Sequence, residues 1–190
     1  MIVNYDVVCM DMWQTIADNG SPLMPEIAKI LNMPLQTVVH SVFAEVFTQK
    51  GDIADLLNTS LKGFNTSQRE QIIKLWKEAP KQAYITREGR LLVEKHYSTH
   101  TPLALVSNVD QYGFENFPEL DYLKSRFDRF YLSFELGMSK PDLRIFEKMR
   151  SDYKTQFSRM LLIGDDEISD QEPATILGIN FQLITANRNT

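Results

Sequence analysis

Residues 7–16 read VVCMDMWQTI, in which four apolar residues lead directly into the carboxylate of Asp11. A short, wholly apolar run of this kind is typical of a strand buried on both faces of a parallel sheet. The only cysteine of the chain, Cys9, lies inside the run, where we interpret it as a core residue rather than a nucleophile. Residues 7–10 are therefore predicted to form a strand with Asp11 at its carboxyl end.

Further short apolar runs follow in the second half of the chain, separated from one another by helical patterns. The runs cover residues 103–106, 130–132, 160–163 and 181–184, and the helical patterns cover residues 90–97, 120–125, 142–152 and a segment that ends at Leu177 before Gly178. Short strands that alternate with helices indicate a parallel α/β sheet. The predicted fold class is therefore α/β, a three-layer Rossmann-like core.

Residues 18–82 have a different pattern, which is helical and contains no convincing strand. Apolar residues recur at spacings of three and four from Leu35 to Phe47, and Ser67 with Glu70 matches the pattern of a capping box. We expect residues 1–17 and 83–190 to form the core domain and residues 18–82 to form an inserted helical cap over the strand ends.

Composition limits the partners of this 190-residue chain. Twenty bases against twenty-five acids give a net charge of −5, which argues against a general nucleic-acid or anionic-membrane binder. No apolar run approaches the roughly 20 residues of a membrane span, and no signal peptide is recognisable at the N-terminus. With a single cysteine, these features favour a cytoplasmic protein, either a monomer or a homodimer.

Polar residues follow several of the predicted strands at the edge where ligands bind in α/β sheets. Several carboxylates at one edge repel one another unless a cation lies among them, and oxygen ligands at this density suit Mg²⁺. A carboxylate that the metal does not satisfy can attack phosphorus, while a hydroxyl and a lysine hold the phosphoryl oxygens. The residues placed there are Asp11, Ser107, Asn108, Lys140, Asp165, Asp166 and Asp170.

Four motifs in this order resemble those of the haloacid dehalogenase superfamily, and together they span nearly the whole chain. They are the apolar strand ending in Asp11, the segment LVSN at residues 105–108, GMSKPD at 137–142 and LIGDD at 162–166 followed by Asp170. The helical insert resembles the small cap that the family carries after its first motif. The resemblance implies a hydrolase that acts on a small phosphorylated molecule.

The resemblance also implies a role for each matching residue. Asp11 would be the nucleophile that forms an aspartyl-phosphate, and Ser107 and Lys140 would hold the phosphoryl group. Mg²⁺ would be bound by Asp11, Asp165 and the backbone carbonyl of Trp13. The remaining candidates are Trp13, Gln14, Thr15 and Asn108 for substrate binding, and Asp166 and Asp170 for support of the metal or the lysine.

The chain departs from the family pattern just after the nucleophile. Family phosphatases carry a second aspartate two residues later as general acid and base, and here that position is Trp13. Loss of this proton transfer is typically worth about 10² to 10⁴ in rate. Gln14 replaces the usual glycine, which restricts the loop. Candidate replacement acids are Asp18, Asp110 and Asp166.

Three hypotheses follow. The first is a Mg²⁺-dependent phosphatase that works best on good leaving groups. The second is a catalytically impaired relative that binds a metal and a phosphometabolite without turnover. The third is a haloacid dehalogenase-type hydrolase, whose members also carry an aromatic residue two positions after the nucleophile but lack the acidic fourth motif. Trp13 itself fits either an aromatic packed between core and cap or a wall of a substrate pocket.

Overall fold

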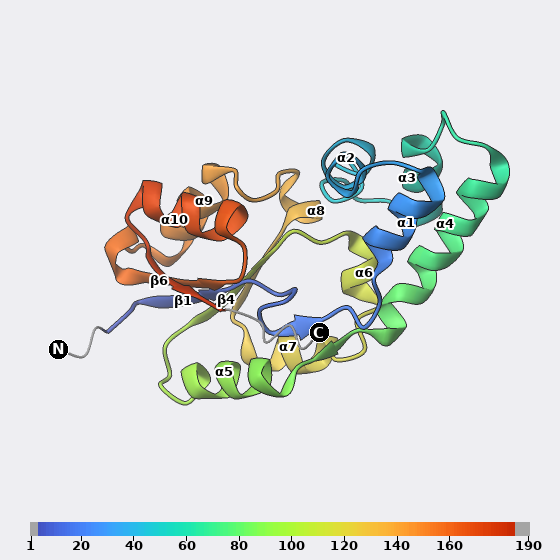
Figure 1. Ribbon diagram of the computed structural model, residues 1–190. Coiled ribbons are helices and arrows are strands. Elements are labelled where there is room, and N and C mark those ends of the chain that lie inside the picture. The colour runs from blue at the N-terminus through green and yellow to red at the C-terminus, as the bar shows by residue number, and fades with distance from the viewer. Residues whose placement is uncertain (1–3, 185–190) are drawn as a thin grey trace.

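The computed structural model describes residues 4–184, so the parts of the predicted core at residues 1–3 and 185–190 lie outside the described residues (Figure 1). One parallel sheet organises the chain, with strand order β5-β4-β1-β6-β7. Its strands are β1 (Val7–Met10), β4 (Leu103–Ser107), β5 (Arg129–Leu132), β6 (Met160–Gly164) and β7 (Asn180–Leu183). The predicted parallel α/β sheet is confirmed.

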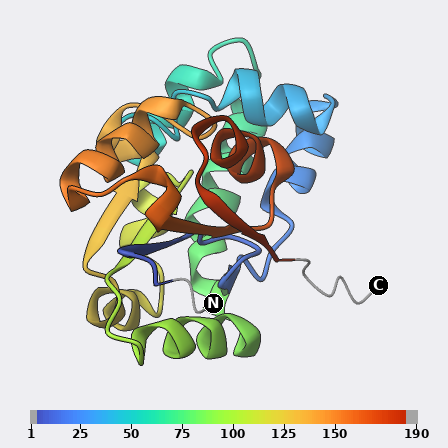
Figure 2. The ribbon, with the colours of Figure 1, turned by 90° about the vertical axis from the view of Figure 1, so that its left-hand side faces the viewer.

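Successive side chains of β1 enter different cores because they point to opposite faces of the sheet. Val8 and Met10 pack in one apolar cluster, which includes residues of α5, α6 and α7. Val7 and Cys9 pack in a second cluster, formed with α9 and α10. Figure 1 shows α5 and α7 on one side of the sheet and α9 and α10 on the other, and Figure 2 shows the same layers after a 90° turn. The three-layer arrangement explains why the four residues of β1 are all apolar.

The core helices differ in length, and several are single turns. The helices of the core are α5 (Arg87–Tyr97), α6 (Gln111–Glu115), α7 (Leu120–Arg126), α8 (Ser133–Leu136), α9 (Leu143–Tyr153) and α10 (Glu172–Leu177), with a 3₁₀ turn η3 (Phe157–Arg159) and a π-helical turn η4 (Glu167–Gln171). Gly178 follows α10 in the left-handed conformation, as predicted for a helix stop. In residues 4–184, the helices are too short or too polar to form a transmembrane segment.

The residues between the first two core strands form a helical group with its own apolar core. Its elements are α1 (Leu23–Leu31), α2 (Leu35–Thr37), the π-helical turn η1 (Val38–Val42), α3 (Ile53–Ser60), α4 (Thr66–Glu78) and the 3₁₀ turn η2 (Ala79–Gln82). Trp76 of α4 is buried at the centre of this core against Phe43 and Phe47. Figure 1 shows the group beside the sheet, on the side toward which β1 runs.

Two details of the helical segment differ from the prediction. The expected helix from Leu35 to Phe47 is interrupted, because the chain widens into a π-helical turn where the amide of Phe43 donates to the carbonyl of Val38. The capping box predicted for Ser67 and Glu70 is wrong: Asn65 and Gln68 form it, each side chain accepting a hydrogen bond from the other residue's amide. Ser67 already lies inside the helix, where its side chain cannot cap the first turn.

Two short antiparallel strands join the two ends of the helical segment. The sequence pattern did not indicate these strands. They are β2 (Ala17–Asp18) and β3 (Tyr84–Ile85). The predicted boundary after residue 17 therefore falls within β2. Gly89 lies so close to Ile16, the residue before β2, that a Cβ at position 89 would overlap the backbone of Ile16.

The turn between β1 and β2 is compact. The carbonyl of Met12 accepts hydrogen bonds from the amides of Ile16 and Ala17, both at 2.9 Å, and the amide of Gln14 donates to the carbonyl of Ala17 at 2.7 Å. Gln14 is exposed and has a φ of 60°, in the left-handed region. Gln14 in place of glycine was expected to restrict the loop, and the structure shows this restriction as backbone strain at Gln14. The left-handed conformation costs an L-residue about 1–2 kcal/mol.

Replacement of Gln14 by glycine should remove this strain. We expect Gln14→Gly to raise the free energy of unfolding by about 1 kcal/mol, because the relieved strain exceeds the added entropy of the unfolded chain. Urea denaturation of the wild type and the variant measures this difference. Gln14→Ala, which keeps a Cβ, is the control, and equal stability of the Gly and Ala variants would contradict the explanation.

Candidate functional site

The carboxyl ends of β1 and β6 bring the predicted acidic residues together. Asp11 follows β1, and its amide donates to the carbonyl of Ile163 at 2.9 Å. Asp165 directly follows β6, and Asp170 lies one turn later in η4. One carboxylate oxygen from each of the three lies within 4.8 Å of the others. Residues separated by more than 150 positions in sequence thus form one cluster.

Lys140 is buried among these carboxylates. Its Nζ atom lies 2.7 Å from Oδ1 of Asp11 and 2.5 Å from Oδ1 of Asp170, and its side chain is 3% exposed. Burial alone would lower the pKa of Lys140, but the two carboxylates raise it above its ordinary value, so the ammonium stays charged. The cation therefore balances the charge of a nucleophile candidate and fixes its orientation.

Asn108 positions the backbone that carries Lys140. Its side-chain amide donates to the carbonyl of Lys140 at 2.9 Å and accepts a hydrogen bond from the amide of the same residue at 2.7 Å. The loop after β4 is thereby attached to the loop before α9. Asn108, proposed from sequence as a substrate-binding residue, thus has its side chain engaged in holding the lysine in place.

Thr15 links the two metal-ligand candidates. Its hydroxyl lies 3.1 Å from Oδ2 of Asp11 and 3.3 Å from Oδ1 of Asp165, within hydrogen-bonding distance of both. With Lys140 on Oδ1, both oxygens of Asp11 are held by polar partners. Thr15 was expected from sequence to contact substrate, and its observed contacts are with the carboxylates.

The cluster has an excess of negative charge. Burial raises the pKa of Asp11, Asp165 and Asp170, for Asp170 to about 6, and the neighbouring carboxylates raise these values further. Lys140 is the one basic side chain paired with them among the described residues. Three oxygen donors with one compensating charge match the preference of Mg²⁺ for carboxylate ligands. The residues present therefore fit a divalent cation.

The loop after β6 depends on a glycine and on a capping aspartate. A Cβ at Gly164 would overlap the carboxyl group of Asp170, so only glycine allows that carboxylate to approach. Asp166 accepts hydrogen bonds from the amides of Ile168 and Ser169 at 2.9 and 2.6 Å. Asp166 thus shapes the turn that places Asp170 against Lys140.

Ser107 ends β4 with a hydroxyl that has no partner. The residue is 1% exposed, and its Oγ makes no hydrogen bond to any described residue. A buried hydroxyl without a partner costs free energy, so such groups are usually paired with protein, water or ligand. The position of Ser107 at the strand end is consistent with a hydroxyl kept free for a bound oxyanion.

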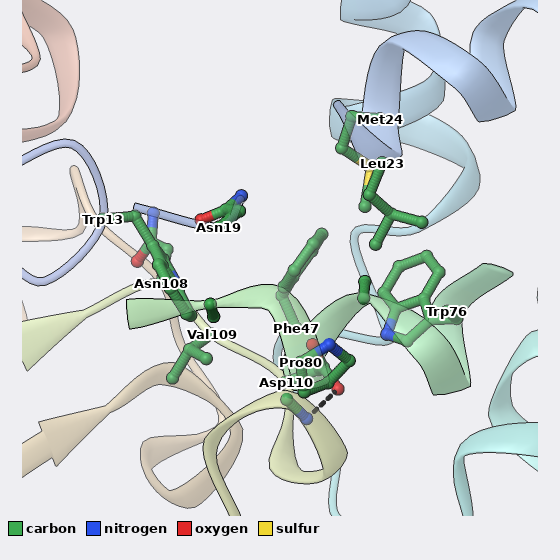
Figure 3. Close-up of a pocket in the computed structure, with 13 residues that line it drawn as sticks. Trp13, Asn19, Leu23, Met24, Phe47, Trp76, Pro80, Asn108, Val109 and Asp110 are labelled. Carbon is green, nitrogen blue, oxygen red and sulfur yellow. Dashed lines mark hydrogen bonds between the residues drawn. The ribbon is translucent and has the colours of Figure 1, made fainter. Parts of the chain in front are cut away.

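Trp13 packs on the core and also lines a pocket. Its ring packs edge-to-face on Phe117, with 5.9 Å between centroids and 87° between planes. It also lines a pocket together with Leu23 of α1 and Trp76 of α4, as Figure 3 shows. The sequence did not identify Phe47 and Trp76 as pocket residues, because aromatic residues at helical spacing usually indicate a buried core.

The three candidate replacement acids all accept hydrogen bonds from backbone amides. Asp18 accepts from Gly20 at 2.7 Å, and Asp110 accepts from Gly113 at 2.8 Å. Asp166 caps η4 as described above. Burial raises the pKa of Asp110, although the Gly113 amide and the Trp76 indole oppose the increase. The pKa of Asp110 is raised on balance, because the effect of burial exceeds that of the hydrogen bonds.

Removal of the Lys140 charge should destabilise the fold in a pH-dependent way. We expect Lys140→Met to lower the free energy of unfolding by about 3–5 kcal/mol at pH 7, since it leaves buried carboxylates without a counter-ion. The pKa values of Asp11 and Asp170 are raised in the folded protein, so the folded state takes up protons before the unfolded state does as pH falls. Proton uptake removes the unpaired charges, so the loss of unfolding free energy in Lys140→Met should be smaller at pH 5 than at pH 7. Urea denaturation at both pH values without divalent cations measures the effect, with Lys148→Met on the exposed face of α9 as control. A deficit independent of pH would contradict the charge explanation.

Comparison with solved structures gives relatives of the same fold over nearly the full chain. A HAD family enzyme from Bacteroides thetaiotaomicron, solved with magnesium and inorganic phosphate, has 20% identity and a TM-score of 0.71, with 96% of each chain covered. A predicted HAD-like family hydrolase from Porphyromonas gingivalis has 17% identity and a TM-score of 0.72, covering 100% of this chain and 94% of that one. A putative HAD-hydrolase from Bacillus subtilis bound to magnesium has 16% identity and a TM-score of 0.67, covering 98% and 91%.

The comparison with curated protein sequences gave no significant match. The family described as haloacid dehalogenase-like hydrolase matches residues 2–184. The match spans all four motifs and the helical segment between the first two, in agreement with the geometry of the site. The chain belongs to the haloacid dehalogenase-like hydrolases.

Proposed function

We propose that the protein is a Mg²⁺-dependent phosphatase that transfers the phosphoryl group of a small molecule to Asp11 and then to water. The observation that carries the proposal is the buried contact of Asp11 with Lys140, beside two further carboxylates and the unpartnered hydroxyl of Ser107. The relative from Bacteroides thetaiotaomicron, solved with magnesium and inorganic phosphate, supports this choice of ligands.

In the first step a carboxylate oxygen of Asp11 attacks phosphorus. The bond between phosphorus and the leaving oxygen breaks, and its electron pair departs with that oxygen. Lys140 and Thr15 hold the attacking carboxylate, and Ser107 donates to a phosphoryl oxygen. Mg²⁺, held by Asp11, Asp165 and the backbone carbonyl of Trp13, would neutralise negative charge on the phosphoryl group.

In the second step water attacks phosphorus of the aspartyl-phosphate, which releases inorganic phosphate and restores the Asp11 carboxylate. The proton that water loses passes to the released phosphate or to solvent, and a leaving alkoxide would in addition need a proton donor. Trp13 can neither accept the first proton nor donate the second, and the carboxylates of Asp18, Asp110 and Asp166 are engaged with backbone amides. The enzyme is therefore expected to favour leaving groups that depart as stable anions, such as acyl and aryl oxygens.

Residues 18–82 serve in this proposal as the cap that selects the substrate, with residues 1–17 and 83–190 as the core domain. The core supplies the reacting groups, while the helices of the insert line the pocket beside them. The proposed substrate is a small molecule in the cytoplasm, where the single buried thiol of Cys9 stays reduced.

Phosphate release from acetyl phosphate and p-nitrophenyl phosphate tests the proposal. We expect release that requires Mg²⁺, is abolished by chelator and falls at least about 10³-fold in Asp11→Asn, because the amide is not a nucleophile. Glycerol phosphate should be a much poorer substrate, since its alkoxide leaves only with a proton.

Two outcomes would overturn this proposal. Mg²⁺-dependent binding of phosphate without turnover of any substrate would support the catalytically impaired binding protein instead. Chelator-insensitive release of halide from a haloacid would support the dehalogenase-type hydrolase.

A rate on glycerol phosphate equal to that on acetyl phosphate would mean that a general acid is present. Loss of the rate on glycerol phosphate in Asp110→Asn would identify Asp110 as that acid.

Ser107→Ala separates a role in phosphate binding from a role in stability. We expect kcat/KM to fall by about 10- to 100-fold, the usual loss when one hydrogen bond to a charged group is removed. The free energy of unfolding should stay the same or increase, because the Ser107 hydroxyl has no partner to lose. Unchanged kinetics together with reduced stability would contradict the assignment.

A further inference from the structure

A mainly apolar pocket adjoins the proposed phosphate site. Its walls come from the loops after β1 and β4, from α1 and α4, and from the segment between Ala79 and Ala83, and its cavity volume is about 180 Å³. In the view of Figure 3, Trp13 lies at the left, Trp76 at the right and Phe47 between them. The apolar lining residues are Trp13, Leu23, Met24, Phe47, Trp76, Ala79, Pro80, Ala83 and Val109.

The pocket begins where the phosphate site ends. Trp13 follows Asp11 by two positions and Asn108 directly follows Ser107, so the two walls continue from the nucleophile and from the free hydroxyl. A phosphoryl group between Asp11 and Ser107 would therefore place its organic substituent toward this pocket. The size of the cavity suits a substituent of the dimensions of a single ring.

The charges of the pocket exclude a second anionic group. None of the described residues that line it is lysine, arginine or histidine, and its one ionisable residue is Asp110. A second phosphate or a carboxylate on the substrate would thus be desolvated without a partner, which is unfavourable. Nucleotides and bisphosphates are poor candidates for this reason.

The polar groups of the pocket are too few to bind a polyol. The side chain of Asn108 is engaged with Lys140, and Asp110 caps α6. Asn19 has a buried side-chain oxygen without a partner among the described residues, so it can accept one hydrogen bond from a bound molecule. A sugar, with its several hydroxyls, would leave most of them unsatisfied.

We propose that the substrate is an aromatic phosphate, a monoester or acyl phosphate whose ring occupies the pocket between Trp13 and Phe47. The assignment rests on the proposed phosphatase function. Aromatic walls favour a ring through edge-to-face and offset contacts. Phenolate and arenecarboxylate oxygens also leave without protonation, which agrees with the absence of an acid at Trp13. The pocket and the reaction thus favour the same substrates.

Binding can be measured without turnover, because the only two tryptophans of the chain, Trp13 and Trp76, both line the pocket. We expect phenylphosphonate with Mg²⁺ to change the intrinsic fluorescence and to bind at least about tenfold more tightly than methylphosphonate, from burial of the ring. Equal affinities would overturn the proposal. Tighter binding of 2-aminoethylphosphonate than of phenylphosphonate would also overturn it, in favour of a cationic group paired with Asp110.

Kinetics test the same preference with matched leaving groups. Benzoyl phosphate and acetyl phosphate both release a carboxylate, so a kcat/KM at least about tenfold higher for benzoyl phosphate would report the ring and not the leaving group. Equal values with both substrates hydrolysed would overturn the aromatic assignment and leave the phosphatase intact. If neither is hydrolysed, the phosphatase proposal fails and the phosphonate titration alone decides whether the pocket accepts a ring.

Met24→Lys places a charge in the pocket wall, away from the reacting groups. We expect it to remove most of the preference for benzoyl over acetyl phosphate, measured as the ratio of the two kcat/KM values within the same variant. Leu91→Lys is the matched control, since Leu91 is 63% exposed on α5 and is not a pocket residue. Retention of the full preference in a folded Met24→Lys protein would contradict the assignment, and thermal unfolding verifies that both variants fold.

Discussion

The buried ammonium of Lys140 is the interaction on which the site depends. It contacts Asp11 at the end of β1 and Asp170 in the loop after β6, and its own backbone is held by Asn108 at the end of β4. Three separate segments of the chain therefore meet at one charge. Because an unpaired carboxylate is unfavourable in such a buried position, the lysine carried by the loop before α9 stabilises this edge of the sheet. The same contact orients the nucleophile candidate.

In the proposed phosphatase, Trp13 at the position of the usual aspartate bears on both the chemistry and the shape of the site. An indole cannot transfer the proton that a leaving alkoxide needs, and the nearby aspartates are engaged with backbone amides. The same ring supplies one wall of the apolar pocket and packs on Phe117 of the core. Under the proposed function, the missing proton donor and the aromatic wall of the pocket both trace to this single position. Gln14, next to Trp13, has a left-handed backbone conformation in this turn, which is strained for glutamine and would be free of strain for glycine.

Much of the fold could be predicted because its signals are local. A strand buried on both faces must be apolar throughout, so residues 7–10 and 160–163 were recognisable, and Gly178 marked the end of its helix. The errors occurred where local patterns were ambiguous. The capping residue shifted from Ser67 to Asn65 within one helical turn, and the pair β2 and β3 is too short to show a period. The interrupted helix before Phe43 kept helical spacing although its hydrogen bonds changed.

The sequence by itself determined the parallel α/β class, the helical insert and the set of candidate residues, because strand period, helix period and motif order are properties of neighbouring positions. Only the tertiary structure decided what those residues contact. Thr15 and Asn108 hold other site residues, Ser107 has no hydrogen-bond partner within residues 4–184, and Phe47 lines the same pocket as Trp13. Such contacts join positions far apart in the chain, and no local pattern encodes the distance between them.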